Sequence, residues 1–474
     1  MASQPARGAA NAEPGRGTVL ARHAPCSPFA GMALRAVVVA VVIGVLALAA
    51  ELGLHGAPAL HDGDVLGPAN WEQARDLLPE EILEHYRRGE YQNRIMEIDR
   101  PGFRSLLNPP DFEAGSRLNR GRFALTPVGS IIDRKTQAPP EHVLGLPFPE
   151  IDAADQDAAR EILWNYFYAT WYRGDSHFVN ALTMIGGRGV ERRIVTDVFM
   201  RMYDGSPESR DRENPANVAV QTLATVISPA DLKGTVSLSW RYREGDKADS
   251  VWTYVPGLRR PRQVNPLNRS DGFLGSDISI DDGPFFDGKP ESFELRLMER
   301  KDQLVLIDPF SVRGEAELVA APGGGLRTVF KDVPRIGADD PQWKGLPWAP
   351  ISAVLVRRPT WIIEAVPRDR NYLYGRLVLR IDAESYHGSW VTKYDRAGKI
   401  IMSYQIANGS FYTLDDGKTY ATSGGIAVQT SENLLYRRAT AVLFEVGRRD
   451  NPADYRVPTT PAQFSPDVLA RLGE

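Results

Sequence analysis

The pattern of apolar and polar positions changes from a helical period to a strand period along the chain. Between Asp152 and Tyr172 apolar side chains recur every three or four residues, and Gly174 follows. This spacing predicts a helix over 152–172 that a glycine ends. Shorter patterns predict helices at the following ranges: 71–77, 79–88 and, midway along the chain, 291–301. The Pro- and Gly-rich stretch 100–149 has little period and is expected to wrap the outside of a sheet.

From Arg192 onward the apolar residues alternate with polar ones. This period of two predicts a series of strands, many of them joined by short turns. They are expected near 194–201, 236–242, 251–255, 304–308, 353–356, 360–366, 375–381, 389–394, 400–406, 426–430 and 437–443. About ten strands on an open sheet must curl. We therefore predict an α+β fold with one large, strongly curved antiparallel sheet covered by helices.

The amino-terminal region has the pattern of an export signal. An unbroken apolar run of 15 residues, Ala36 to Ala50, follows Arg35. Its length is typical of a signal peptide, with a small-residue cleavage site near Ala57–Ala59. The alternative is an uncleaved anchor over 36–54. The true start is Met1 or Met32.

The domain prediction follows from this signal. Residues 1–59 are expected to be a disordered leader plus the signal peptide. Residues 60–474 are expected to form one domain, because no linker divides them. Within it we expect helical and extended structure over 60–190, the sheet over 191–445 and an extended tail over 446–474.

The charge and the cysteine content exclude several classes of function. The chain has 56 Lys and Arg against 60 Asp and Glu, a net charge of −4, and no basic stripe that would bind nucleic acid. Its one cysteine, Cys26, excludes a disulfide framework and a cysteine-based zinc site. Residues 60–474 contain no cysteine, which suits an oxidising compartment.

The sequence carries none of the common catalytic motifs, and we expect neither a cofactor nor a metal site. It has no His-Glu-x-x-His, no phosphate-binding loop, no dinucleotide fingerprint and no Gly-x-Ser-x-Gly. The densest acidic cluster contains Asp277, Asp281 and Asp282. We favour an acidic turn whose carboxylates cap backbone N–H groups. An irregular calcium loop and a pair of hydrolytic carboxylates stay open.

Two neighbouring segments resemble a known family. The first runs Trp252-Thr-Tyr254-Val-Pro256-Gly257, and the second contains Asp277, Asp281 and Asp282. This pair resembles the DUF1329 family of exported proteobacterial proteins, which is distantly similar to the lipoprotein carriers LolA and LolB. The resemblance implies a periplasmic location, a half-barrel with an apolar cavity, and binding without enzymatic chemistry. It also implies an RND-type exporter and an outer-membrane protein as partners.

The apolar faces of the predicted elements supply candidates for the wall of such a cavity. These candidates are Ile162, Phe167, Leu238, Trp240, Tyr242, Leu377, Leu379, Met402 and Tyr404. Phe285-Phe286, beside Gly283-Pro284, is expected to place one ring at a cavity mouth or docking surface, or to pin its loop to the core.

The leading hypothesis is a periplasmic carrier or chaperone for a hydrophobic molecule, either a lipid or a lipoprotein acyl chain. One alternative is a periplasmic hydrolase that uses Asp277, Asp281 or Asp282. The other is a structural adaptor of an envelope complex that binds no ligand.

Overall fold

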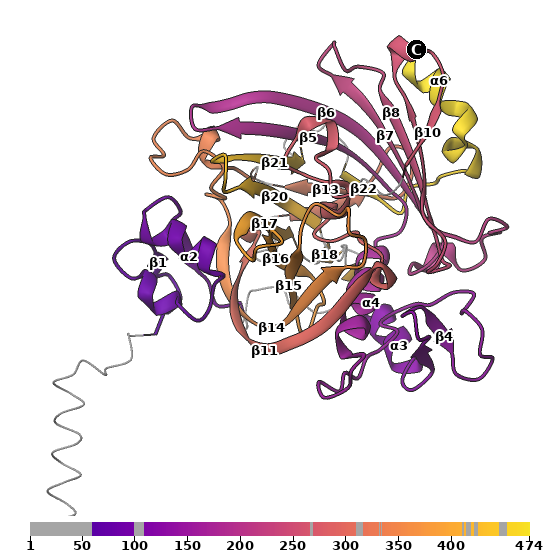
Figure 1. Ribbon diagram of the computed structural model, residues 1–474, viewed down its shortest axis with the longest axis horizontal. Helices are drawn as coiled ribbons and strands as arrows, with labels where there is room; N and C mark the ends of the chain where they lie inside the picture. The colour runs from indigo at the N-terminus through magenta and orange to yellow at the C-terminus, as the bar shows by residue number, and fades with distance from the viewer. Residues whose placement is uncertain are drawn as a thin grey trace, which may run out of the picture. The chain divides into compact units, whose positions relative to one another are not determined.

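Most strands of the computed structural model belong to one sheet (Figure 1). The structure describes residues 59–98, 109–265, 269–309, 316–330, 332, 334–409, 412–413, 419–420, 425–444 and 453–474. The predicted leader and signal peptide therefore lie outside the described residues, except for Ala59. In the described part of the chain this sheet has 18 strands.

One half of the sheet is a run of antiparallel neighbours in chain order. Its strands are β5 (Ser176–Gly186), β6 (Gly189–Met202), β7 (Val218–Ser228), β8 (Val236–Tyr242), β9 (Ser250–Tyr254) and β10 (Arg262–Val264). Short connections between sequential strands produce this order.

The other half continues from β5 in the opposite direction, again antiparallel. Its strands are β21 (Arg438–Phe444), β20 (Gly425–Asn433), β17 (Ile400–Gly409), β16 (Gly388–Tyr394), β15 (Arg376–Asp382), β14 (Val354–Pro367) and β11 (Phe293–Ile307). At its end β11 meets β17 through a parallel bridge between Ile307 and Asn408. This half therefore curls until two non-neighbouring strands meet.

Short elements complete the structure. The remaining strands are β1 (Val65–Leu66), β2 (Asn93–Ile95), β3 (Phe123–Leu125), β4 (Ile131–Asp133), β12 (Ala316–Ala320), β13 (Leu326–Phe330), β18 (Tyr412–Thr413), β19 (Thr419–Tyr420) and β22 (Ala453–Tyr455). The α-helices are α2 (Glu80–Arg87), α3 (Pro110–Leu118), α4 (Ala158–Trp171) and α6 (Leu469–Gly473). Single 3₁₀ turns, such as Trp71–Ala74 and Ile280–Asp282, lie in the connections.

The predicted α+β class with a large, mainly antiparallel sheet is confirmed. Helices α2 and α4 lie within the ranges expected for them. A glycine with positive φ follows each one: Gly89 at 71° and Gly174 at 74°. Glycine adopts this left-handed conformation without a steric penalty, so it ends a helix efficiently.

The helix expected over 291–301 is wrong. Strand β11 occupies this stretch and pairs with β14. Phe293, Leu295 and Leu297 alternate with Glu294 and Arg296, which is the period of a strand. The long strands of the sheet begin with β5 at Ser176 rather than at 191, because β5 is buried on both faces and so lacks a clear alternation. The short strands β1 and β2 of the same sheet come earlier still.

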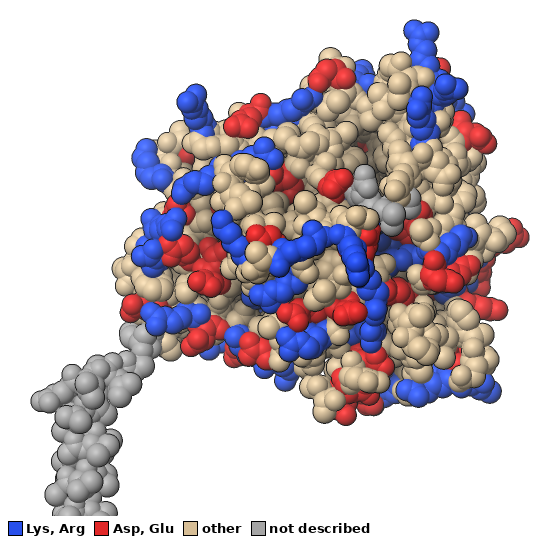
Figure 2. Space-filling model, viewed as in Figure 1, with Lys and Arg blue, Asp and Glu red and all other residues tan. Residues whose placement is uncertain are grey.

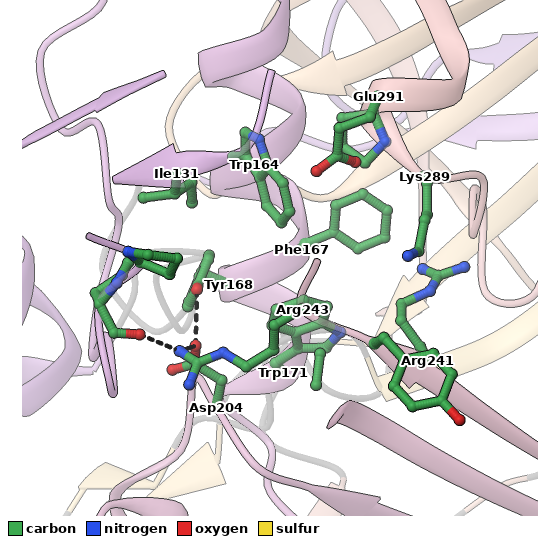
Figure 3. A pocket seen from close by; sticks show the side chains of 15 residues that line it. Ile131, Trp164, Phe167, Tyr168, Trp171, Asp204, Arg241, Arg243, Lys289 and Glu291 are labelled. Atoms are coloured by element: carbon green, nitrogen blue, oxygen red, sulfur yellow. Dashed lines mark hydrogen bonds and ion pairs between the residues drawn. The ribbon is translucent and has the colours of Figure 1, made fainter. Parts of the chain in front are cut away.

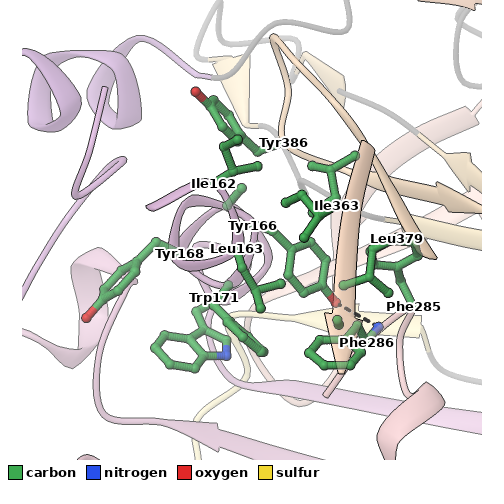
Figure 4. Packing of buried hydrophobic residues seen from close by; sticks show 14 of the residues in the cluster. Ile162, Leu163, Tyr166, Tyr168, Trp171, Phe285, Phe286, Ile363, Leu379 and Tyr386 are labelled. Carbon is green, nitrogen blue, oxygen red and sulfur yellow. Dashed lines mark hydrogen bonds between the residues drawn. The ribbon is translucent and has the colours of Figure 1, made fainter. Parts of the chain in front are cut away.

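Helix α4 carries the main hydrophobic core. Its side chains Ile162, Leu163 and Tyr166 pack against β14 and β15, including Ile363 and Leu379 (Figure 4). A second core lies beneath α2, and a third lies between β8, β9 and the C-terminal segment that contains α6. Among the described residues, none of the helices combines the length and the apolar character needed to span a membrane.

Candidate functional site

A cavity of about 250 Å³ lies between α4 and the half of the sheet formed by β5 to β9. Apolar side chains make up about half of its lining. These are Phe167, Trp171, Phe178, Leu182, Val198, Met200, Val220, Ala224, Val251, Phe273, Ile278, Ile280, Pro284 and Val442. For scale, an engineered apolar cavity of about 150 Å³ binds benzene. The space is thus large enough for an organic ligand.

The strand period explains which side chains reach this space. Every second residue points to the same face of a sheet. On β6 these are Thr196, Val198 and Met200, and on β8 they are Ser237 and Ser239. Small and medium side chains on this face leave the space beneath α4 unfilled.

A network of charged side chains forms another part of the lining. Arg241 Nη1 donates to Asp287 Oδ1 at 2.8 Å, and Arg269 Nη2 donates to Asp287 Oδ2 at 2.6 Å. Arg269 also pairs with Asp249 at 3.0 Å and with Asp281 at 2.6 Å. Burial alone would lower the pKa of Arg269, but the nearby aspartates raise it above its usual value. These cations are therefore neutralised within the protein.

A smaller pocket of about 50 Å³ adjoins the cavity, and the two share Phe167, Trp171 and Arg241 (Figure 3). Asp204 accepts hydrogen bonds there from Tyr168 Oη at 2.9 Å and from Arg243 Nη2 at 2.6 Å. The aromatic residues of α4 thus separate two hollows.

The structure places the β8 candidates away from the cavity, which corrects that part of the predicted lining. Leu238 and Trp240 lie on the opposite face of β8 and pack with the C-terminal segment. Trp240 Nε1 donates to the carbonyl of Phe464 at 2.9 Å. Tyr242 lines the smaller pocket. The reason is that both faces of this strand are covered, and its apolar residues face the C-terminal segment rather than α4.

The candidates on the other strands lie in the packed core. Leu377, Leu379, Met402 and Tyr404 are buried together with Ile162 of α4, and none of the five lines the cavity. They fill the space on the β14–β17 side of α4, so the structure places them in the packed core rather than in the wall of this cavity. Phe167 lines both the cavity and the smaller pocket.

The first family segment lies on the outer side of the cavity strands. Trp252 stacks edge-on against Trp240 with ring centroids 5.3 Å apart, and Tyr254 is buried in the same core. Pro256 and Gly257 form the exposed turn after β9. Trp252 and Tyr254 pack with the C-terminal segment, and none of the four residues lines the cavity.

Each carboxylate of the second family segment has a cationic partner. Asp277 accepts from Arg438 at 3.0 Å, and Asp281 pairs with Arg269. Asp282 forms an ion pair with the fully buried Lys393, and it accepts from the backbone N–H and hydroxyl of Ser279 at 2.8 Å. Burial alone would lower the pKa of Lys393, but Asp282 raises it. The three carboxylates point to three separate partners.

Phe285 and Phe286 are both buried in the core beside α4 (Figure 4). Tyr166 stacks edge-on against Phe285 with centroids 5.3 Å apart. The expectation that one ring marks an exposed mouth or docking surface is wrong. Phe285 has φ of 71°, and this left-handed residue turns the loop so that both rings point inward.

Sequence reasoning missed the polar part of the lining. Ser237 and Ser239 alternate with the apolar residues of β8, so the alternation identified the strand but gave no sign of which face borders the cavity. Arg173, which follows α4, also lines the cavity. Its only sequence signal is its place beside the helix-ending Gly174.

The described residues include no group of three or more His, Cys, Asp or Glu side chains placed to hold a metal ion. On the face shown in Figure 2, Lys and Arg side chains are interspersed with Asp and Glu. That face therefore offers no extended surface of one charge.

Comparisons with known proteins give one family and several solved structures. The model of the family described as "Protein of unknown function (DUF1329)" matches residues 66–323. None of the curated proteins matches the chain.

Similar solved structures include a putative outer membrane lipoprotein-sorting protein domain from Vibrio parahaemolyticus. It is 15% identical, with a TM-score of 0.43, and the match covers 67% of this chain and 100% of that one. A DUF1329 family protein from Desulfovibrio piger is 14% identical, with a TM-score of 0.42 and coverage of 66% and 98%. A LolA superfamily protein from Nitrosomonas europaea is 11% identical, with a TM-score of 0.37 and coverage of 65% and 98%.

Proposed function

The chain belongs to the DUF1329 family, and from this premise we propose that it is a periplasmic carrier that holds a hydrophobic molecule beneath α4. The observation that carries the proposal is the cavity of about 250 Å³, with apolar side chains over about half of its wall. A bound apolar molecule would displace water from the apolar part of this wall and bury it, which favours binding.

The rest of the core supports a dedicated binding space. The β14–β17 side of α4 is filled by large side chains, among them Tyr404 and Phe285. The cavity of about 250 Å³ thus lies on the side of the helix away from β14–β17. Burial of apolar surface would drive binding, at about 25 cal/mol per Å². A partner with a higher-affinity site would cause the cargo to be released.

The location in the periplasm is part of the proposal. The apolar run 36–50 supports export, and the lack of cysteine in 60–474 suits an oxidising compartment. We take residues 60–474 as one carrier domain. An RND-type exporter and an outer-membrane protein stay predictions from the family resemblance.

Two observations favour the carrier over the two alternatives. A hydrolase would use Asp277, Asp281 or Asp282, but these carboxylates pair with three different cations and none of them lines the cavity. A structural adaptor needs an exposed docking surface, and both rings of the candidate for one, Phe285-Phe286, are buried. We therefore propose binding without catalysis.

The test narrows the cavity by replacing one small side chain of its wall with a large one. Ala224 of β7 lines the cavity, whereas the next residue, Thr225, points to the opposite face. We expect wild type and Thr225→Trp to bind the neutral probe N-phenyl-1-naphthylamine, and Ala224→Trp to bind it about tenfold more weakly. Probe fluorescence measures the affinity, and thermal melting shows that each variant is folded.

Equal binding by Ala224→Trp and wild type would overturn the assignment of the cavity. Absence of probe binding by the wild type would overturn the carrier function itself. Native mass spectrometry of the protein from its own host would then identify the molecule that co-purifies with the wild type and is missing from Ala224→Trp.

A further inference from the structure

Arg173 is a buried cation in the wall of the cavity. It follows α4 directly, is 4% exposed, and reaches the space beneath the helix. Its Nη2 donates to Met200 Sδ at 3.2 Å, and its Nε has no hydrogen-bond partner. A thioether is a weak acceptor, so the guanidinium makes far fewer hydrogen bonds than its five N–H groups allow.

Arg173 also has no ion-pair partner of its own among the described residues. Asp287 attracts its charge from a distance, but this carboxylate is already paired with Arg241 and Arg269. In the part of the chain that the structure describes, no carboxylate forms an ion pair with Arg173, whereas the cavity cations Arg241 and Arg269 each pair with aspartates. Burial lowers the pKa of Arg173, but an arginine stays protonated at neutral pH. The C-terminal end of α4 supplies only the partial negative charge of a helix dipole.

Buried charges in proteins are normally paired. A ligand anion would complete the site, because a carboxylate accepts two parallel hydrogen bonds from a guanidinium. The surrounding wall, with Phe178 and Val198, would receive the apolar part of the same ligand. The volume, less than twice that of a cavity that holds benzene, suits one alkyl chain rather than two.

Building on the proposed carrier function, we propose that the cargo is a single-chain amphiphile with a carboxylate head, and that Arg173 binds this head while the chain lies beneath α4. Arg173 thereby selects an acid over a neutral molecule of equal length. The carrier function itself requires only the apolar wall, so the two claims can fail separately.

The test measures displacement of N-phenyl-1-naphthylamine by three twelve-carbon ligands: dodecanoate, dodecanol and dodecyl phosphate. We expect the wild type to bind dodecanoate about tenfold more tightly than dodecanol. Arg173→Met, which keeps the side chain's bulk without its charge, should bind both equally and still bind the probe. Arg173→Lys should keep part of the preference.

Arg380 provides the matched control. As in Arg173, the Nε of Arg380 has no hydrogen-bond partner. However, Arg380 donates to Thr392 through Nη1, and it lines no part of the cavity. Arg380→Met should keep the full preference for dodecanoate.

The outcomes separate the two proposals. If the wild type binds the probe but does not prefer dodecanoate, the role of Arg173 is overturned and the carrier function still stands. This result does not depend on whether Arg173→Met folds. A preference retained in folded Arg173→Met overturns it as well. Tighter binding of dodecyl phosphate than of dodecanoate would replace the carboxylate with a phosphate head. A wild type that binds no probe overturns the carrier function.

Discussion

At the scale of single residues, His85 shows how burial and charge set a pH dependence. Its Nδ1 lies 2.7 Å from Glu90 and its Nε2 lies 2.8 Å from Glu432 of β20. Burial alone would lower the pKa of His85, but the two carboxylates raise it to about 9. The charged imidazole thus ties α2 to the sheet.

This arrangement predicts how stability changes with pH. The pKa of His85 is higher in the folded protein than the value of about 6.5 in an unfolded chain, so folding favours the protonated form. The contribution is complete below pH 6.5, is lost as the pH rises to 9, and amounts to about 3 kcal/mol. Urea unfolding of wild type and His85→Gln should therefore differ most near pH 6 and least above pH 9.

Two further variants check the cause. Glu90→Gln and Glu432→Gln each remove one carboxylate from His85, so each should reduce the pH dependence without abolishing it. A difference between wild type and His85→Gln that is the same at pH 6 and pH 9.5 would contradict the role of the protonated imidazole.

At the scale of elements, β8 shows what alternation does and does not reveal. The alternation of Leu238 and Trp240 with Ser237 and Ser239 identified the strand. It could not show which face borders the cavity, because that depends on the C-terminal segment, which is distant in sequence and packs against the apolar face. Phe167 could be assigned to the cavity wall because it lies on the apolar face of α4, and that face follows one helical period throughout.

Other elements were missed for related reasons. In β11 the run of charged residues after Leu297 hid the alternation, and a bulge shifts its register between Leu297 and Glu299. Arg173 carries no pattern at all. Its role depends on its burial and on its lack of an ion-pair partner among the described residues, and both are properties of the folded chain.

Substitutions on the two faces of this half of the sheet should have different effects, one on stability and the other on probe affinity. Trp240→Ala removes a half-buried ring and its hydrogen bond to Phe464, and should cost about 2 kcal/mol of stability. Because Trp240 faces away from the cavity, affinity for N-phenyl-1-naphthylamine should be unchanged. Urea unfolding and probe titration measure the two effects, and limited proteolysis should cleave the C-terminal segment sooner. Weaker probe binding with unchanged stability would contradict this division of the faces.

At the scale of the whole molecule, α4 divides the interior into a filled side and an unfilled side. On the filled side its residues pack against β14 and β15, and on the other side the cavity separates it from β5 to β9. Local opening of a protein is easiest where few apolar contacts hold an element. The β5–β9 side should therefore open more often than the β14–β17 side when no ligand is bound.

Hydrogen exchange measured with and without the neutral probe tests this asymmetry. A ligand at about a hundred times its dissociation constant stabilises the protein by about 2.7 kcal/mol. If the cavity side opens separately, backbone amides of α4 and β5–β8 should gain protection, while those of β15 and β16 change little, since their core is already filled. Equal gains on both sides would mean that the two sides open only together. The ligand would then stabilise the molecule as one cooperative unit, and release of cargo would require opening of the whole fold rather than of the cavity side alone.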